Sequence, residues 1–234
     1  MSLRRGGSSP LTDTSSTLVM DKFDLVPLFA TPLAIIKVDE ILFDKENLLK
    51  KCVFYDAAQR QTQTTVDDTN GSFSTLSGMP GSILDEYPYQ KERLMSYFNT
   101  FKNNVLKLTS TEFKITTSWI TKTIPGGFSE LHNHKNSVFS AVFYFDDVTG
   151  GDIVFESINT DYGSMLLNDP DEWGPYTARD WTYKPEKNTM IIFPSSIYHR
   201  VKLNNSNEDR YSMAINFFPT GKIGLNDSSI DLGN

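Results

Sequence analysis

The hydrophobic positions of this chain follow two different periods. Over residues 85–108 the large apolar side chains recur at spacings of three and four, which predicts one apolar face of an amphipathic helix. The members of this face are Leu94, Phe98, Phe101, Val105 and Leu108. Further along, the period changes to the short apolar or alternating runs that are typical of β-strands. The helix is therefore expected to cover the back of a sheet.

About eight short strands are predicted, separated by turn residues. One lies within the apolar segment 25–38, and the others occupy 113–124, 137–145, 151–156, 181–183, 188–194, 198–203 and 210–218. Asp44 is placed to cap a further helix that runs to about Ala58. Helices followed by a run of strands favour a mainly β protein with flanking helices. The expected form is a double-stranded β-helix, which is a cupin-like jelly roll.

Composition narrows the possible partners. The 234 residues carry 22 Lys and Arg against 29 Asp and Glu, a net charge of −7, so no nucleic-acid partner is expected. No apolar run approaches the roughly 18 residues of a membrane-spanning helix, so no membrane partner is expected either. The single cysteine, Cys52, cannot form an internal disulfide, which favours a cytoplasmic location.

The chain contains only three histidines, and their positions suggest a metal site. His132 and His134 come directly before the strand that begins near Ser137, and His199 begins a late strand. Residues i and i+2 of a strand point to the same face, and an early and a late strand of a jelly roll can be neighbours. Three ligands that converge from two strands resemble the facial arrangement of non-haem iron sites. The sequence therefore predicts that His132, His134 and His199 hold one metal ion.

Arg210 is a second candidate, because it lies in an apolar strand. Alternation places Arg210 and Ser212 on one face of that strand, together with Ala214 and Asn216. A buried guanidinium needs an anionic partner, and its fork matches a carboxylate with two hydrogen bonds. A structural salt bridge is the alternative explanation. Taken together with the histidines, the pattern favours a ligand carboxylate.

These motifs carry a family resemblance. The stretch from about Trp119 to Phe218 resembles the prolyl 4-hydroxylase-like branch of the 2-oxoglutarate/Fe(II) oxygenase superfamily. It is similar to a little-characterised group common in marine bacteria and cyanophages. The features that carry the resemblance are, in order, His132-Asn133-His134, the strand 140–144, Gly150-Gly151, Phe193-Pro194, His199 and Arg210-Tyr211-Ser212. Segments 28–32 and 216–221 also look like the marine group.

The resemblance implies roles for these residues. His132 and His199 would hold Fe(II), and Arg210 would grip the C5 carboxylate of the co-substrate 2-oxoglutarate with help from Ser212. Tyr144 and Asn216 are expected to line the same pocket. The implied reaction converts 2-oxoglutarate and O₂ to succinate and CO₂ while an unidentified substrate is hydroxylated. That substrate is a small molecule or a peptidyl proline, and the compartment is the host cytoplasm if a phage encodes the protein.

Position 134 departs from the superfamily pattern, which has a carboxylate where this chain has His134. Either three imidazoles hold the metal, or His134 stands aside and water takes its place. Glu130 and Asp152 are further candidate carboxylates. A neutral third ligand leaves the site more positive by one unit of charge, which can reduce discrimination against zinc or nickel.

Two other functions fit the histidines without 2-oxoglutarate. One is a cupin-like jelly roll that binds a sugar or protein partner around a structural metal. The other is a three-histidine dioxygenase that uses oxygen alone. The Arg210-Tyr211-Ser212 motif argues against the first, because a structural metal needs no carboxylate clamp.

Two segments are candidates for covering such a site. Residues 61–81 are polar and rich in turn residues, and we expect a loop that closes as a lid opposite the histidines. If that loop has no such role, the specificity residues are expected in 168–180, where Trp173 and Tyr176 offer aromatic side chains. Residues 1–23 are expected to be a disordered tail, and residues 24–234 a single domain.

Overall fold

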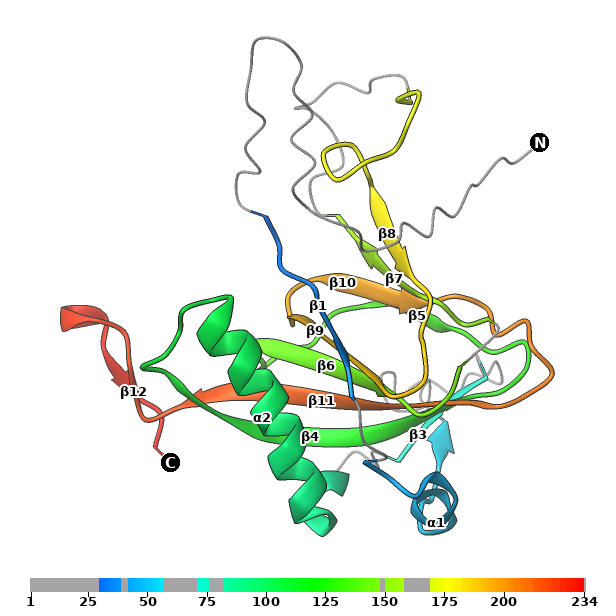
Figure 1. The fold of residues 1–234 in the computed structure, drawn as a ribbon, viewed down its shortest axis with the longest axis horizontal. Helices are drawn as coiled ribbons and strands as arrows, with labels where there is room; N and C mark the ends of the chain where they lie inside the picture. The colour runs from blue at the N-terminus through cyan, green and yellow to red at the C-terminus, as the bar shows by residue number, and fades with distance from the viewer. Residues whose placement is uncertain are drawn as a thin grey trace.

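Two antiparallel sheets dominate the structure, a computed structural model that describes residues 30–38, 42–56, 71–75, 82–147, 150–157 and 169–233. The major sheet has the order β1 (Ala34–Lys37), β9 (Thr189–Pro194), β6 (Phe139–Tyr144), β11 (Arg210–Thr220), β4 (Glu112–Thr123), β3 (Ser72–Ser74), β2 (Tyr55–Asp56). The minor sheet has the order β5 (Ser129–His132), β10 (Tyr198–Val201), β7 (Ile153–Glu156), β8 (Asp180–Tyr183). Figure 1 shows the two sheets with the long helix on the outside.

Strand alternation gives the major sheet two different faces. On β6, Phe139 and Phe143 belong to a large outer cluster of buried side chains, whereas Val142 and Tyr144 belong to a smaller inner cluster. The inner cluster also contains Phe155 of the minor sheet, so the two sheets face each other across it. The space between the sheets is the place where polar side chains of both sheets can meet.

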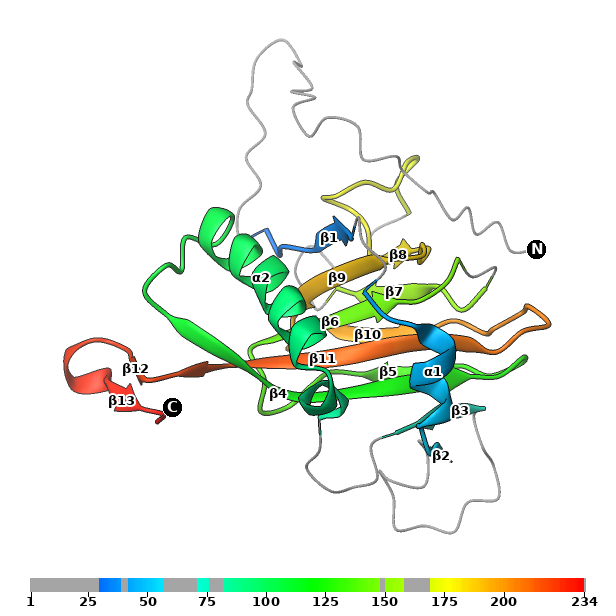
Figure 2. The same ribbon diagram turned by 60° about the horizontal axis from the view of Figure 1, so that its bottom comes forward.

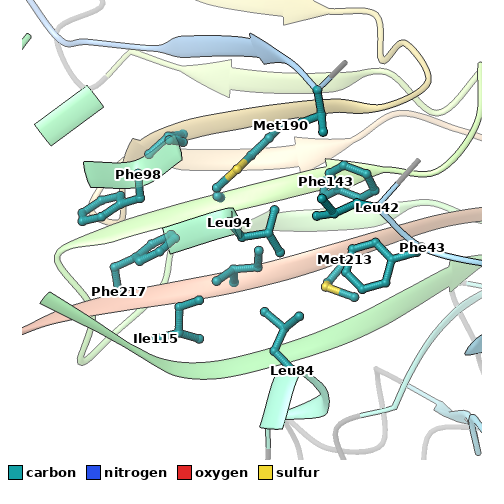
Figure 3. Packing of buried hydrophobic residues seen from close by; sticks show 14 of the residues in the cluster. Leu42, Phe43, Leu84, Leu94, Phe98, Ile115, Phe143, Met190, Met213 and Phe217 are labelled. Carbon is teal, nitrogen blue, oxygen red and sulfur yellow. The ribbon is translucent and has the colours of Figure 1, made fainter. Parts of the chain in front are cut away.

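Helix α2 (Pro88–Asn104) covers the outer face of the major sheet (Figure 2). Its apolar stripe presents Leu94 and Phe98, both completely buried, to β11 and β4 (Figure 3). The Phe98 ring stacks on that of Phe217 with centroids 4.1 Å apart and planes 7° apart. Among the described residues, no helix is long and apolar enough to cross a membrane.

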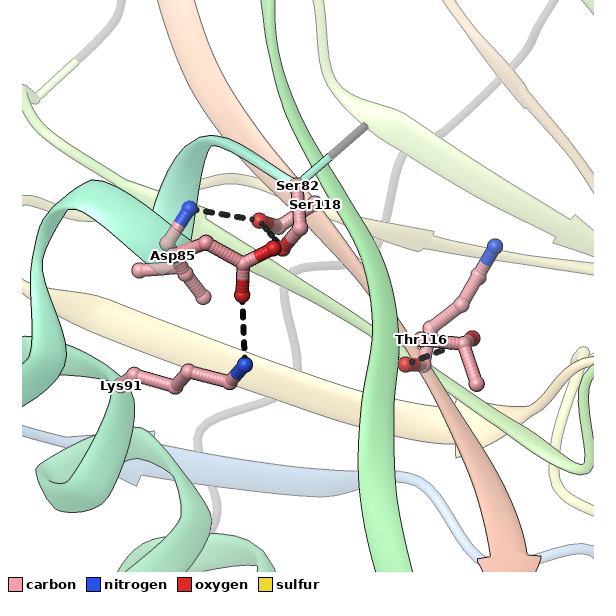
Figure 4. Close-up of polar contacts among 7 residues, drawn as sticks. Ser82, Asp85, Lys91, Thr116 and Ser118 are labelled. Carbon is pink, nitrogen blue, oxygen red and sulfur yellow. Dashed lines mark hydrogen bonds and ion pairs between the residues drawn. The ribbon is translucent and has the colours of Figure 1, made fainter. Parts of the chain in front are cut away.

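The chain enters α2 through a short anchored turn, η2 (Ile83–Glu86). The hydroxyl of Ser118 on β4 accepts a hydrogen bond from the Leu84 backbone N–H at 3.0 Å and lies 2.6 Å from the Ser82 hydroxyl (Figure 4). Elsewhere, α1 (Lys45–Lys50) precedes β2, and the C-terminal segment forms β12 (Lys222–Ile223), η3 (Asn226–Ser228) and β13 (Ile230–Asp231). This C-terminal hairpin was not predicted.

The helix predictions were right in kind and too long. Asp44 caps α1 by accepting the Asn47 N–H at 3.2 Å, but α1 ends at Lys50 because the chain then extends into β2, which pairs with β3. The predicted stripe of α2 also stops early. Val105 and Leu108 remain 61% and 38% exposed, because the helix ends at Asn104 and the chain turns back toward β4.

The region 61–81 is only partly described. Its residues 72–74 form β3, paired with both β2 and β4, so a loop without regular structure is wrong for this part. Residues 61–70 and 76–81 lie outside the described residues, as does the expected tail of residues 1–23. The lid therefore stays a prediction.

Phe98 offers a direct test of the packing between α2 and the major sheet. Phe98→Ala should lower the free energy of unfolding by about 3–5 kcal/mol, because it leaves a cavity against Phe217. Urea unfolding measures this change. Glu92→Ala, on the exposed side of the same helix, should change it by less than about 0.5 kcal/mol. Equal effects of the two substitutions would contradict this packing.

Candidate metal centre

Three histidine side chains meet in the space between the two sheets. His132 ends β5 and is the cross-strand partner of His199 on β10. The ring centroids are 4.4 Å apart for His132 and His199, 5.1 Å for His134 and His199, and 5.5 Å for His132 and His134. One ligand atom from each ring lies within 4.8 Å of the other two. This triangle can hold a single metal ion.

The position of His134 differs from the prediction. We expected it two residues along the same strand as His132, but β5 ends at His132. His134 lies in the connection to β6, where its backbone N–H donates to the Ser195 carbonyl at 3.0 Å. The turn, rather than strand alternation, brings this imidazole back to the other two.

All three imidazoles point the same nitrogen away from the cluster. Each Nδ1 meets a carbonyl oxygen: Glu130 O at 2.8 Å from His132, Ile197 O at 3.1 Å from His199, and Asn216 Oδ1 at 2.7 Å from His134. Carbonyl oxygens only accept hydrogen bonds, so each Nδ1 carries the proton and each Nε2 keeps a free lone pair. Metal-binding histidines have this arrangement, in which an outer partner fixes the ring. The donor set therefore fits a metal ion.

Burial keeps two of these imidazoles neutral. Desolvation lowers the pKa of His199 to about 3 and that of His134 to about 4, and the hydrogen bond from His134 to Asn216 opposes the second shift. The rings of Phe193 and Phe155 pack against His199 at centroid distances of 4.9 and 6.1 Å. Neutral imidazole is the form that binds a metal, so the site is set for binding at neutral pH.

A second polar group lies at the start of β11, where Arg210 is only 2% exposed. Its guanidinium carbon lies 5.2 Å from the ring centroid of Tyr144, which is completely buried. Burial lowers the pKa of Arg210 and raises that of Tyr144, with the neighbouring guanidinium opposing the second shift. Ser212 is the cross-strand partner of Tyr144 and shares its face.

Arg210 has no carboxylate partner in the described part of the chain. Three buried polar atoms of Arg210 and its neighbours have no hydrogen-bond partner in that part of the chain: Nε of Arg210, the hydroxyl of Tyr144 and the hydroxyl of Thr123. Thr123 is the cross-strand partner of Arg210. Asp152 attracts the guanidinium electrostatically, but its carboxylate lies 4.0 Å from Lys202 and forms no ion pair with Arg210. Three buried polar atoms without a partner, one of them on the cation itself, are suited to an anionic ligand with acceptor oxygens.

Small residues lie around this cation. A Cβ on Gly151, whose φ is +68°, would lie 2.9 Å from Cδ of Arg210, so only glycine allows this approach. Between Arg210 and Asn216, which are about 20 Å apart along an extended strand, the inward positions of β11 are Ser212 and Ala214. The stretch of β11 between the guanidinium and the histidines therefore presents only small side chains to the interior.

The structure divides the predicted site residues between two ends of the same interior. His132, His134 and His199 form one group, and Arg210, Ser212 and Tyr144 form the other. Asn216 lies beside His134 rather than beside Arg210. Among the described residues, neither Glu130 nor Asp152 joins the histidine cluster.

Two residues of the site were missed in the sequence. Thr123 stands opposite Arg210, and Ser140 lies 3.1 Å from Nδ1 of His134. Both are inward positions of predicted strands, so alternation could have indicated their direction. The cross-strand register that brings them to the site was the missing information.

The middle of the chain matches a known family. Residues 117–216 match the family described as "Putative 2OG-Fe(II) oxygenase", a span that contains all three histidines and Arg210. No curated protein matches the chain.

Two solved structures share the fold. An oxidoreductase of the 2OG-Fe(II) oxygenase family from Burkholderia pseudomallei is 14% identical with a TM-score of 0.50, over 79% of this chain and 84% of that one. A prolyl hydroxylase from Trichoplax adhaerens, in complex with a hypoxia inducible factor peptide fragment, is 13% identical with a TM-score of 0.51, over 80% and 83%. The predicted double-stranded β-helix is confirmed. The family match confirms the predicted resemblance at the level of 2-oxoglutarate/Fe(II) oxygenases.

Replacing His199 tests the metal centre. His199→Ala should abolish stoichiometric iron after anaerobic loading with Fe(II) and dialysis, because it removes the most buried of the three ligands. Elemental analysis measures the iron content. Tyr198→Ala, on the opposite face of β10, should keep it. Full iron content in His199→Ala would rule out this site.

Proposed function

We propose that this protein is an Fe(II)- and 2-oxoglutarate-dependent dioxygenase that hydroxylates a substrate C–H bond. The buried guanidinium of Arg210, which has no carboxylate partner in the described residues, carries the proposal. An unpaired buried charge costs several kcal/mol, so the site calls for an anion. The distal carboxylate of 2-oxoglutarate has this charge and matches the guanidinium fork.

Each group of residues has a role in this proposal. His132, His134 and His199 hold Fe(II) through their Nε2 atoms. Arg210 binds the C5 carboxylate, and the hydroxyls of Tyr144 and Thr123 donate to the same oxygens, which gives these two hydroxyls and Nε of Arg210 a partner. Ser212 lies beside Tyr144 on the face toward the co-substrate. The three-imidazole set replaces the usual two histidines and one carboxylate.

When bound, Fe(II) with 2-oxoglutarate supplies oxidative decarboxylation, in which O₂ and the co-substrate yield succinate and CO₂ as the substrate gains a hydroxyl group. The chain binds, orients and shields the reactants. Phe155 and Phe193 pack on one side of His199 and exclude water there. Arg210 fixes one end of the co-substrate, so that its other end is directed at the histidines.

The substrate side is best sought along the minor sheet. Trp181 on β8 is the cross-strand partner of Phe155, and Phe155 is the partner of His199, so the three side chains share the inner face. Trp181 is 42% exposed, whereas His199 is 3% exposed, which places the tryptophan at the open end of this row. Nearby, Arg179 lies over the ring of the exposed Trp173 at 5.6 Å. Peptidyl proline and small molecules are the substrate classes to assay.

A cupin-like protein with a structural metal is the second candidate function. The observation in its favour is His134 at the position of the family carboxylate, because a neutral ligand set also suits zinc. Such a protein has no use for a carboxylate clamp around Arg210. We place the protein in the cytoplasm, where its single cysteine would stay reduced.

Substitution of Arg210 tests the clamp. Arg210→Ala should weaken 2-oxoglutarate binding to the Mn(II)-loaded protein by about 2–5 kcal/mol, because one partner of a desolvated charge pair is removed. Arg210→Lys should recover part of the affinity, since an ammonium lacks the fork. Calorimetry measures both. Equal affinity of the wild type and Arg210→Ala would refute the proposed function.

Gly151 provides an independent test that leaves the charge in place. Gly151→Ala should weaken 2-oxoglutarate binding at least tenfold, because the added methyl group would displace the side chain of Arg210. Gly126→Ala is a matched control: Gly126 also has a positive φ, of +77°, but a Cβ there would meet nothing within 4 Å. Titration calorimetry compares the two variants. Equal losses of affinity in both would show that backbone strain, and not Arg210, causes the effect.

A further inference from the structure

We propose that Asn216 is a positioning residue that, together with Thr117, holds His134 as the third metal ligand. The inference rests on the proposed function, because it completes the metal site of that function. It also assigns a specific role to a side chain that the sequence placed with the co-substrate.

His134 needs a partner that the other two histidines do not need. His132 and His199 are each held by the backbone carbonyl of the residue two positions earlier in the chain. His134 lies beyond the end of β5 and has no such local support among the described contacts of its ring. Its Nδ1 instead meets the side chain of Asn216, 82 residues further along the chain, at 2.7 Å. The orientation of this imidazole therefore depends on β11.

The direction of the Asn216 amide decides which nitrogen of His134 is free. Oδ1 faces His134, while Nδ2 donates to the hydroxyl of Thr117 on β4 at 3.0 Å. With Oδ1 toward the ring, Nδ1 must carry the proton and Nε2 keeps its lone pair. If the amide turned around, its NH₂ group would require Nδ1 to accept, and the proton would move to Nε2. In the observed orientation Thr117 accepts the amide N–H, which leaves Oδ1 of Asn216 to face Nδ1 of the metal-binding tautomer.

A buried group of serine hydroxyls supports the same amide. Ser140 Oγ lies 2.9 Å from Oδ1 of Asn216 and 2.8 Å from Oγ of Ser195. Ser195 Oγ lies 2.9 Å from Oγ of Ser137, and the Ser195 carbonyl accepts the backbone N–H of His134. Ser140 and Ser195 are completely buried. Several buried polar groups therefore form hydrogen bonds around one imidazole ring. Such a network is expected where the orientation of the ring matters, and not around a histidine without a role.

Four variants test this assignment. Asn216→Leu removes the acceptor at similar size, Asn216→Asp keeps an acceptor oxygen, and Thr117→Val removes the hydroxyl that orients the amide. Thr116→Val is the matched control, because Thr116 neighbours Thr117 but is exposed and donates to the backbone carbonyl of Asn216, at 3.4 Å, rather than to its amide (Figure 4). Two readouts are used. Calorimetry gives the affinity for Mn(II) without 2-oxoglutarate, and ¹⁵N NMR of the metal-free protein gives the tautomer of His134.

The expected results separate positioning from folding. Asn216→Leu should weaken Mn(II) binding about 10–100-fold, which is the usual effect of losing an outer partner of a ligand. Thr117→Val should weaken it by less and give a mixture of His134 tautomers. Asn216→Asp should bind within a few-fold of the wild type, and Thr116→Val should match the wild type in both readouts. Thermal unfolding confirms that each variant is folded.

Wild-type Mn(II) affinity in folded Asn216→Leu would overturn the inference. So would an unchanged His134 tautomer in both Asn216→Leu and Thr117→Val. Wild-type affinity in His134→Ala would also overturn it. In that case the proposed function stands if 2-oxoglutarate still binds through Arg210, since His132 and His199 would hold the metal without His134. Loss of the Arg210 effect would instead remove the proposed function.

Discussion

The proposed site depends on one constraint, the buried guanidinium of Arg210, which has no carboxylate partner in the described residues. Arg210 is held inside the protein by the apolar strand that carries it and by close packing against Gly151. Removing such a charge from water costs several kcal/mol unless an anion compensates it. The hydroxyls of its neighbours Tyr144 and Thr123 are likewise without hydrogen-bond partners. A fold that tolerates all three is best explained by a ligand that satisfies them together.

The two faces of the major sheet have different roles, which allows the inner face to hold a buried charge. The outer face is packed by α2 and supplies apolar burial, as the stacked rings of Phe98 and Phe217 show. The inner face of the same strands can therefore carry Arg210, Ser212 and Asn216 at alternate positions of β11. The minor sheet then adds His132 and His199, which pairing of β5 with β10 sets side by side. The alternation of side chains along each strand thus separates the stabilising core from the binding site.

The sequence predicted the parts of this site that depend on short-range pattern. Alternation along β11 placed Arg210 and Ser212 on one face. The prediction that an early and a late strand bring His132 and His199 together agrees with the pairing of β5 with β10. The sequence did not predict what tertiary register decides. His134 is not on the strand of His132, and the contact of Asn216 with His134 depends on how a turn packs against β11. The helix ends were missed for a similar reason, since α1 stops where β2 pairs with β3.

The most direct test of the account is ligand-induced stabilisation of the Mn(II)-loaded wild-type protein. 2-Oxoglutarate at 100 times its Kd should raise the stability by about 2.7 kcal/mol, seen as an increase in Tm. Pyruvate, which keeps the 2-oxo acid but lacks the distal carboxylate, should have a much smaller effect at the same concentration. Removal of the metal should reduce the response to both. Equal stabilisation by 2-oxoglutarate and pyruvate, or none by either, would contradict the assignment of Arg210 as a carboxylate clamp.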